Sequence, residues 1–371
     1  MSAGHPILQF GTSRFLQAHV DLFVSEGSDA LGGITVVQGT DNPASTKRSQ
    51  ALADGYDVVI RGLSGGQPLE TRKTCRSVRE VLHARADWQA LRERVRGPVR
   101  VIVSNTGDSG WALAPSDNAG QLAEGAEAPS SFPARLLVLL HARWQANPGT
   151  ELTLLPCELV SRNGDRLRDL IVSLAREWHC APPFVEWLQV HPVWGNSLVD
   201  RIVSEALEPA GAVAEPYALW AIEAQPRLQL PCSHPAIVLT DDLPRHERLK
   251  LFLLNLGHTL LAELWQRGRL AADMTVLQAM QDALLRQPLE RAWLREVLPV
   301  FDALGQGDEA RAYLVSLRDR FLNPFLVHRI ADIAQNHDMK KARRIRPLVE
   351  LAEVYAPALH QPLLRAALAP H

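Results

Sequence analysis

The chain has 371 residues, 46% of them hydrophobic, which is enough to bury a sizeable core in two domains. Its 39 basic and 41 acidic residues give a formal net charge of -2, which argues against a nucleic-acid or anionic-membrane binder. The four cysteines show no CxxC spacing, so neither a zinc ribbon nor a disulfide framework is expected. We therefore predict a cytoplasmic protein with no export signal or membrane span, a small-molecule substrate, and a monomer or small homo-oligomer.

The first forty residues have the order strand, glycine turn, helix, strand. Residues 6–10 form an apolar run that stops at Gly11, residues 15–27 have helical periodicity, and residues 34–39 form a second apolar run. This order opens a nucleotide-binding α/β fold, in which the helix N-terminus faces a pyrophosphate.

The predicted pyrophosphate loop is Gly11-Thr12-Ser13-Arg14-Phe15, in which Ser13 replaces the second glycine of the usual G-x-G. Asp41, after the second strand, is the candidate acid for the ribose hydroxyls of NAD. Lys47 and Arg48 follow closely enough to leave NADP open.

Strands and helices alternate from there to residue 243. We predict strands at 56–63, 99–103 and 151–156, and an extended segment at 215–228. We predict helices within 77–95, at 133–145, and after the turn at Asn163-Gly164 with Asp165 as N-cap. Residues 107–131 are rich in Ala, Gly, Pro and Ser and predict a surface loop.

Two polar segments in this part are candidate ligand contacts. Asn105 and Thr106 follow the strand at 99–103, where open α/β sheets bind ligands, although an ordinary turn explains them as well. Asn196, Asp200 and Arg201 lie together in WGNSLVDRIV, where an Asp followed by Arg is also typical of a structural ion pair.

Beyond Asp242 the pattern is helical throughout. We therefore predict an α/β protein with a Rossmann-type dinucleotide-binding domain and mostly parallel sheet at 1–243. An all-α domain at 244–371 would carry substrate and catalytic residues.

The first helix of that domain contains KLFLLNLGH, whose polar residues Lys250, Asn255 and His258 fall within a sector of about 140° on an otherwise apolar helix. A buried ammonium is costly unless it is partnered or deprotonated, so Lys250 is a candidate general base. An alternative remains: Lys250 could reach water at the helix start, Asn255 could satisfy the backbone, and His258 could be a core histidine.

A basic run lies near the C-terminus. It is either a solvated helix face or a site for one anionic substrate group, and it comprises Lys340, Lys341, Arg343, Arg344 and Arg346.

Several segments, in order over nearly the whole chain, carry a resemblance to a known family. They are ILQFGTSRFLQAH, SNTGDSG, SSFPARLLVLL, LLPCELVSRNGDRLRDL, GNSLVDRI, EPYALWAIE, KLFLLNLGH and RFLNPFLVHRIADIA. Together they resemble the long-chain mannitol dehydrogenase family of polyol and sugar-acid dehydrogenases, most closely its tagaturonate reductase (altronate oxidoreductase) branch. The K-x4-N-x2-H spacing combined with NSLVDRI carries most of the resemblance.

The resemblance implies an NAD-dependent secondary alcohol dehydrogenase that needs no metal. It assigns Lys250 as general base, Asn255 to an oxyanion hole, and His258 to orienting the substrate hydroxyls. It implies that Asp200 contacts substrate or tunes the lysine and that Asn163 is a second oxyanion-hole amide. The candidate cofactor contacts are Gly11, Thr12, Ser13, Arg14, Phe15, Asp41, Asn105, Thr106 and Asn196.

The resemblance also bears on substrate choice. Lys340 matches a family lysine that contacts substrate, and Asp332 stands where the mannitol-specific branch carries an arginine, which argues against mannitol itself. His328 and Asn336 are nearby candidates for substrate contact or for core and N-cap roles. The chain is about a quarter shorter than the fuller family members.

Three functions compete at this point. The first is oxidation of a polyol or an altronate-like aldonate to its keto form, and the reverse. The second is a sugar-alcohol phosphate dehydrogenase, with the basic run holding the phosphate. The third is a nucleotide-binding regulatory protein without catalysis.

Overall fold

The computed structural model describes residues 5–39, 43–107 and 110–369, without the side chains of residues 43–46. The chain divides into two compact units. The first comprises Met1–Val59, Arg72–Ala214 and Ala218–Leu243, and the second comprises Ile60–Thr71, Glu215–Tyr217 and Pro244–His371. Two short segments from the first part of the chain therefore belong to the second unit.

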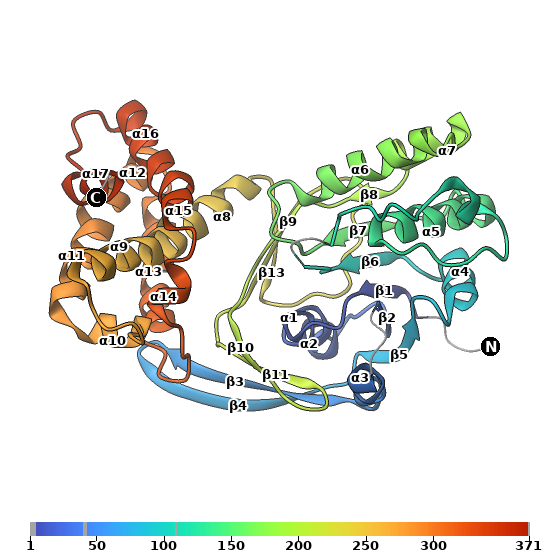
Figure 1. Cartoon of the computed structure of the whole chain (residues 1–371), viewed down its shortest axis with the longest axis horizontal. Helices are drawn as coiled ribbons and strands as arrows, with labels where there is room; N and C mark the ends of the chain where they lie inside the picture. The colour runs from blue at the N-terminus through green and yellow to red at the C-terminus, as the bar shows by residue number, and fades with distance from the viewer. Residues whose placement is uncertain (1–4, 40–42, 108–109, 370–371) are drawn as a thin grey trace. The chain divides into compact units, whose positions relative to one another are not determined.

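The first unit contains a six-stranded parallel sheet in the order β5-β2-β1-β6-β7-β8 (Figure 1). Its strands are β1 (Ile7–Phe10), β2 (Ile34–Gln38), β5 (Val78–His83), β6 (Val101–Ser104), β7 (Thr153–Pro156) and β8 (Val193–Trp194). This is the strand order of the dinucleotide-binding doubly wound fold, and it reverses direction between β1 and β6. The predicted parallel Rossmann-type sheet is confirmed.

Strands β1, β2, β6 and β7 are buried at every position, as parallel strands covered by helices on both faces require. Leu8 is in register with Ile102, and Ile102 with Leu154; all three share one core with the helices on that face. Ile7 and Val101, one residue before Leu8 and Ile102, point the other way and are also fully buried. The helices of this unit are α1 (Arg14–Gln17), α2 (Val20–Glu26), α3 (Pro43–Asp54), α4 (Trp88–Arg96), α5 (Phe132–Ala146), α6 (Asn163–Glu177) and α7 (Pro182–Val190), with a 3-10 turn at Ala119–Leu122.

The helix predicted within residues 77–95 is confirmed as α4, but other local features of this region were not predicted correctly. Residues 78–83 form strand β5, which was not predicted and pairs in parallel with β2. The strand β4 (Gln67–Cys75) and the helix α7 were not predicted. Helix α6 is preceded by Arg162 at the N-cap position, and Asp165 lies in its first turn.

Two smaller antiparallel or mixed sheets complete the strands. One has the order β10-β11-β3-β4 and the other β13-β12-β9. Their strands are β3 (Tyr56–Ser64), β9 (Ser197–Asp200), β10 (Val203–Ala206), β11 (Gly211–Ala214), β12 (Leu219–Glu223) and β13 (Ile237–Thr240). The base of the β3–β4 hairpin belongs to the first unit and its tip, within residues 60–71, to the second.

From residue 244 the second unit is helical, as predicted (Figure 1, yellow to red). Its α-helices are α8 (Leu243–Leu249), α9 (Leu256–Gly268), α10 (Val276–Gln281), α11 (Ala283–Ala292), α12 (Leu298–Ala303), α13 (Gly307–Phe321), α14 (Ile330–Ile333), α15 (His337–Arg344), α16 (Arg346–Tyr355) and α17 (Pro362–Leu368). They share one hydrophobic core, in which Trp293 and Phe301 are the largest fully buried apolar side chains.

Two segments of this unit are π-helical: η2 (Lys250–Asn255) and η3 (Trp293–Val297). The sequence predicted one regular helix through residues 246–265, but the structure inserts η2 between α8 and α9. Hydrogen bonds in a π-helix join residues five apart, so Lys250 and Asn255 lie one turn apart. The π segment thus brings the first two polar residues of KLFLLNLGH onto the same side.

Candidate functional site

One candidate ligand site, in the first unit, lies at the carboxyl ends of β1, β2 and β6. A cavity of about 700 Å³ opens there, next to the point where the strand order reverses. Open α/β sheets bind ligands at this position. Its lining includes Gly11, Ser13, Gly39, Asn105, Thr106 and Arg135.

Gly11 and Ser13 shape the loop after β1 in different ways. Gly11 has a φ of +120°, and a Cβ there would lie 2.6 Å from the carbonyl oxygen of Asn105, so only glycine fits. Ser13 has a φ of −66° and needs no glycine; its Oγ accepts a hydrogen bond from Leu16 N at 3.3 Å as the N-cap of α1. Serine therefore occupies the position of the second glycine without backbone strain.

Asn105 and Thr106 are both in this cavity, and their side chains are held by neighbouring strands. Asn105 Nδ2 donates to the carbonyl of Cys157 at 3.0 Å, and Thr106 donates to Glu158 Oε1 through both N and Oγ1 at 3.0 Å. Ser104 Oγ donates to the other oxygen of Glu158 at 2.9 Å. Sequence reasoning missed Glu158; its place just after β7, at the same sheet edge as Asn105, was the available signal.

Other predicted cofactor residues have different surroundings. The Arg14 guanidinium donates to Ser204 O at 3.2 Å, and Phe15 stacks on His19 with ring centroids 4.7 Å apart. Thr12 lines the cavity, and so does Arg48, which forms an ion pair with Glu208. The predicted ribose contact Asp41 lies outside the described residues.

The amide of Asn196 is fully buried and holds the start of α6. Its Nδ2 donates to Glu223 Oε2 at 2.7 Å and to Asp165 Oδ2 at 3.2 Å, while its Oδ1 accepts from Asp165 N at 3.1 Å. These contacts favour a structural role over direct cofactor contact.

Asn163, the predicted second oxyanion amide, is also buried. Its Nδ2 donates to the carbonyls of Pro156 (2.8 Å), Ser197 (2.9 Å) and Glu158 (3.2 Å), and its Oδ1 accepts from Ser197 N and Gly164 N. Because both amide hydrogens are engaged, these contacts favour holding β7, β9 and α6 together. Asp200, in the same unit, ends β9 in register with Leu219 and is 4% exposed.

In the second unit, the half-buried Lys250 and Asn255 lie on η2, and His258 lies one turn further, on α9. The carbonyl of Asn255 accepts a hydrogen bond from Thr259 Oγ1 at 2.8 Å. The predicted catalytic trio is thus brought together on one short stretch whose other side chains are mostly buried and apolar.

Aromatic contacts fix the imidazole of His258, which is 8% exposed. Its ring stacks on Phe321, with centroids 4.3 Å apart and planes 12° apart, and meets the edge of His328 at 5.0 Å. Phe321 in turn contacts Trp293, whose Nε1 donates to Leu253 O in η2 at 3.2 Å. This chain of rings links the π segment to the orientation of His258.

Gly257 lets Trp293 approach α9. A Cβ at residue 257 would lie 2.6 Å from Cζ2 of the indole, a distance that non-bonded carbons do not tolerate. The glycine of KLFLLNLGH is therefore required by packing and not by an unusual φ.

Around His258 lie further polar groups from α14 and α15. Burial lowers the pKa of His328, an effect that Asp332 opposes and Lys340 reinforces. Lys340 Nζ donates to Ile333 O at 2.7 Å, and burial, followed by the charge of Arg344, lowers the pKa of Lys340. Asn336 is the N-cap residue of α15, with a φ of 54°, and makes no side-chain cap bond.

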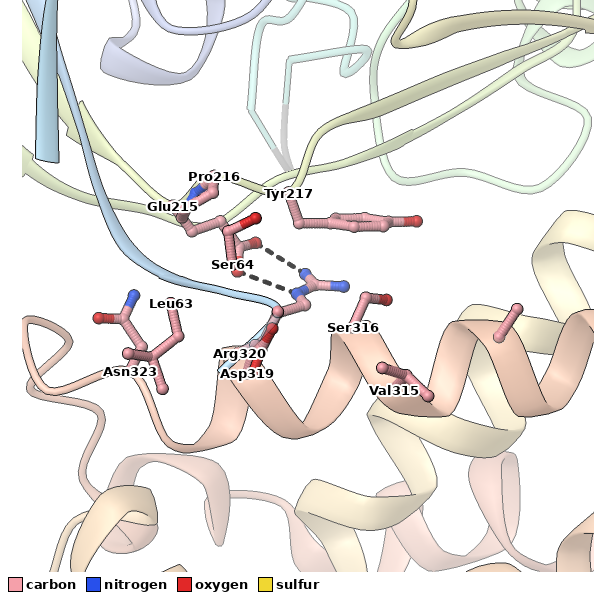
Figure 2. Close-up of a pocket in the computed structure, with 12 residues that line it drawn as sticks. Leu63, Ser64, Glu215, Pro216, Tyr217, Val315, Ser316, Asp319, Arg320 and Asn323 are labelled. Atoms are coloured by element: carbon pink, nitrogen blue, oxygen red, sulfur yellow. Dashed lines mark hydrogen bonds and ion pairs between the residues drawn. The ribbon is translucent and has the colours of Figure 1, made fainter. Parts of the chain in front are cut away.

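A separate cavity of about 280 Å³ in the second unit contains none of the predicted site residues (Figure 2). Figure 2 shows the Arg320 guanidinium between the Glu215 carboxylate and the Tyr217 ring. Arg320 forms two contacts to Glu215, at 2.9 and 3.0 Å, and its Cζ lies 4.4 Å from the Tyr217 ring centroid. This buried pair attaches the segment Glu215–Tyr217 to α13.

Among the residues described, no group of three or more His, Cys, Asp or Glu side chains could hold a metal ion. In the same residues, no helix is both long and apolar enough to cross a membrane.

Comparisons with known proteins cover almost the whole chain. Residues 5–231 match the Mannitol dehydrogenase Rossmann domain, and residues 242–369 match the Mannitol dehydrogenase C-terminal domain. The altronate oxidoreductase of Halalkalibacterium halodurans is 30% identical, over 92% of this chain and 69% of its own length. The altronate oxidoreductase of Klebsiella pneumoniae (strain 342) is 32% identical, over 92% of this chain and 74% of its own length.

Two solved structures share the fold. D-sorbitol dehydrogenase in substrate-free form matches with a TM-score of 0.80 and 18% identity, covering 98% of this chain and 80% of that one. The Pseudomonas fluorescens mannitol 2-dehydrogenase complex with NAD and D-mannitol matches with a TM-score of 0.71 and 19% identity. The match covers 99% of this chain and 79% of that one.

Proposed function

Because the chain belongs to the mannitol dehydrogenase family, we propose that it interconverts the CH–OH group of a polyol or aldonate with the corresponding ketone. The Rossmann domain and the NAD complex of the similar Pseudomonas fluorescens mannitol 2-dehydrogenase support NAD as the proposed cofactor. Relatives that cover most of the chain are named altronate oxidoreductase, so an altronate-like sugar acid is the favoured substrate.

In the proposed reaction, Lys250 takes the proton of the substrate hydroxyl. The Asn255 amide donates a hydrogen bond to the oxygen as negative charge develops on it, and His258 holds a neighbouring hydroxyl. When bound, NAD would supply the acceptor for the hydride, which leaves the carbon atom that bears this hydroxyl. In the reverse direction the protonated Lys250 returns the proton to the carbonyl oxygen.

The observation that carries this proposal is the π-helical turn from Lys250 to Asn255. It lines up an amine and an amide one turn apart, and the ring stack from Trp293 to Phe321 orients His258 beside them. Isolated π turns in α-helices occur frequently at functional sites.

The residues of the first unit have supporting roles in this proposal. The contacts of Asn163 favour a positioning role, so we assign the oxyanion contact to Asn255 alone. Asp200 is proposed to contact substrate or to act on Lys250. Gly11, Ser13 and the residues after β6 are proposed to hold the cofactor pyrophosphate, and Arg48 in the same cavity leaves NADP open.

The test is Lys250→Ala. We expect turnover of an aldonate such as altronate to fall by about 10²- to 10⁴-fold, since this is the typical contribution of a general base, with unchanged affinity for NADH by fluorescence titration. Lys73→Ala, which removes an exposed lysine paired with Glu26, is the matched control and should keep full activity. Added chelator should change nothing.

Near-normal turnover of the Lys250→Ala enzyme would contradict the assigned role. Cofactor binding without turnover across a panel of polyols and sugar acids would contradict the reaction itself. Activity only toward hexitol phosphates would favour a sugar-alcohol phosphate dehydrogenase.

A further inference from the structure

The four basic residues of α15 differ in burial and in pairing. Lys341 is buried and paired with Glu263 (3.3 Å) and Asp338 (3.2 Å), and Arg343 is exposed. Lys340 and Arg344 are half-buried, four residues apart, and therefore lie on the same face of the helix. Only these last two combine burial with a lack of acidic partners, since no ion pair to either is found within residues 5–39, 43–107 and 110–369.

Arg344 reaches the catalytic segment. Its Nη1 donates to Thr259 Oγ1 at 3.2 Å, and Thr259 Oγ1 donates to the carbonyl of Asn255 at 2.8 Å. Thr259 directly follows His258 in the chain. The guanidinium therefore lies one side chain away from the backbone that carries the proposed oxyanion donor, and four of its five N–H groups are not used in this bond.

Burial costs this guanidinium part of its hydration. Burial is also the one cause that lowers the pKa of Arg344, with no opposing carboxylate. Lys340, which spends one donor on Ile333 O, adds a like charge at i, i+4. Lys340 and Arg344 are thus two neighbouring, half-buried cations without an anion, and this arrangement lowers the stability of the fold. An anionic ligand bound between them would reduce this loss of stability.

The cations also border the substrate hydroxyl site. The charge of Lys340 acts on His328, whose ring lies 5.0 Å from that of His258. A ligand held by His258 through a hydroxyl and by Arg344 through an anionic group would thus have its two ends in one small region of the second unit.

We propose that Arg344, together with Lys340, binds the carboxylate of a sugar-acid substrate and so makes the enzyme prefer aldonates to neutral polyols. This inference rests on the proposed function. A guanidinium presents parallel N–H donors that match the two oxygens of a carboxylate, and one arginine with one lysine suits a single negative charge.

The test compares a six-carbon aldonate with the hexitol that has CH2OH in place of its carboxylate. In Arg344→Gln we expect kcat/KM for the aldonate to fall by roughly 10- to 100-fold, mostly through KM, because a charge-assisted bidentate contact is lost. Turnover of the hexitol should change by less than about threefold, since the hexitol has no carboxylate for Arg344 to bind. Arg343→Gln makes the same charge change on the same helix and should alter neither substrate.

Two further readouts keep the test decisive. With NADH present, the aldonate should raise the Tm of the wild-type protein and of Arg343→Gln but not that of Arg344→Gln. If Arg344→Gln folds poorly, Arg344→Lys can replace it, because lysine keeps the positive charge but cannot form the bidentate contact. Its kcat/KM should fall less than that of Arg344→Gln, and again only for the aldonate.

Equal losses for aldonate and hexitol in Arg344→Gln would overturn the inference while leaving the proposed function intact. A wild-type enzyme that oxidises neither compound would instead overturn the proposed function. Selective loss of a hexitol phosphate activity would overturn the carboxylate assignment.

Discussion

Gly257→Ala tests the packing that supports the catalytic segment. The added methyl carbon would lie 2.6 Å from Cζ2, 3.1 Å from Cε2 and 3.2 Å from Nε1 of Trp293. The indole has little room to withdraw, because it is fully buried, contacts Phe321, and donates to Leu253 O. Either the indole tilts and loses this hydrogen bond, or α9 shifts.

The magnitude follows from three contributions. Overpacking of a well-packed core costs about 1–3 kcal/mol, and a lost indole hydrogen bond costs about 1 kcal/mol. Replacing a helical glycine by alanine returns about 1 kcal/mol. We therefore expect Gly257→Ala to lower the free energy of unfolding by about 1–3 kcal/mol. Turnover should also fall, because the Trp293–Phe321 stack orients His258.

The assay is equilibrium unfolding in urea, with Gly268→Ala in the same helix as the matched control. A Cβ at Gly268 would meet only the flexible side chain of Leu270, at 3.1 Å, so this variant should be as stable as wild type or slightly more so. Equal unfolding midpoints for the two variants would refute the reasoning about the Trp293 contact.

Two further predictions concern the first unit. Gly11→Ala should weaken NADH binding by at least tenfold in fluorescence titration, because the added Cβ would collide with Asn105 O and the φ of residue 11 is positive. The control variant Ser13→Gly should bind NADH with normal affinity. Equal affinities of the two variants for NADH would contradict this reasoning. Burial raises the pKa of Asp21 from 3.8 to about 7, against a hydrogen bond from Tyr56. Between pH 3.8 and 7 the Asp21 carboxyl is therefore protonated in the folded state and ionised in the unfolded state. Its contribution to the free energy of unfolding is fully present below pH 3.8 and is lost as the pH rises through 7. In urea unfolding at pH 8, Asp21→Asn should therefore be more stable than wild type by at most about 4 kcal/mol, and at pH 4 it should show no such gain. A gain in stability that does not depend on pH would contradict the raised pKa of Asp21.

Local patterns predicted much of the nucleotide-binding unit. The apolar runs that became β1, β2 and β6 end in glycine or polar residues, the run that became β7 ends in proline, and the structure confirms each strand. The pattern failed at β5, because the sequence of Val78–His83 does not alternate regularly and lies in a longer stretch that also contains α4. A half-buried strand at a sheet edge carries a weaker signal than a fully buried one.

The candidate site was predicted in part. The sequence selected Lys250, Asn255 and His258 from their spacing, but assumed a regular helix, because hydrophobic periodicity does not distinguish five α-helical residues from a π turn. The sequence did not single out Glu158, and it offered Arg344 only as one of five residues in a basic run. The contacts that distinguish these two residues come from other elements: Thr106 for Glu158 and Thr259 for Arg344.

The sequence by itself determined the class of fold, since this depends on composition and hydrophobic spacing along the chain. It also supplied the residues that we propose for the chemistry. Only the tertiary structure decided how those residues are held. The Glu215–Arg320 pair joins residues 105 apart, and Trp293 packs against Gly257 from another helix. Such contacts form between elements distant in sequence, and they depend on the packing of whole helices and strands, which no local pattern encodes.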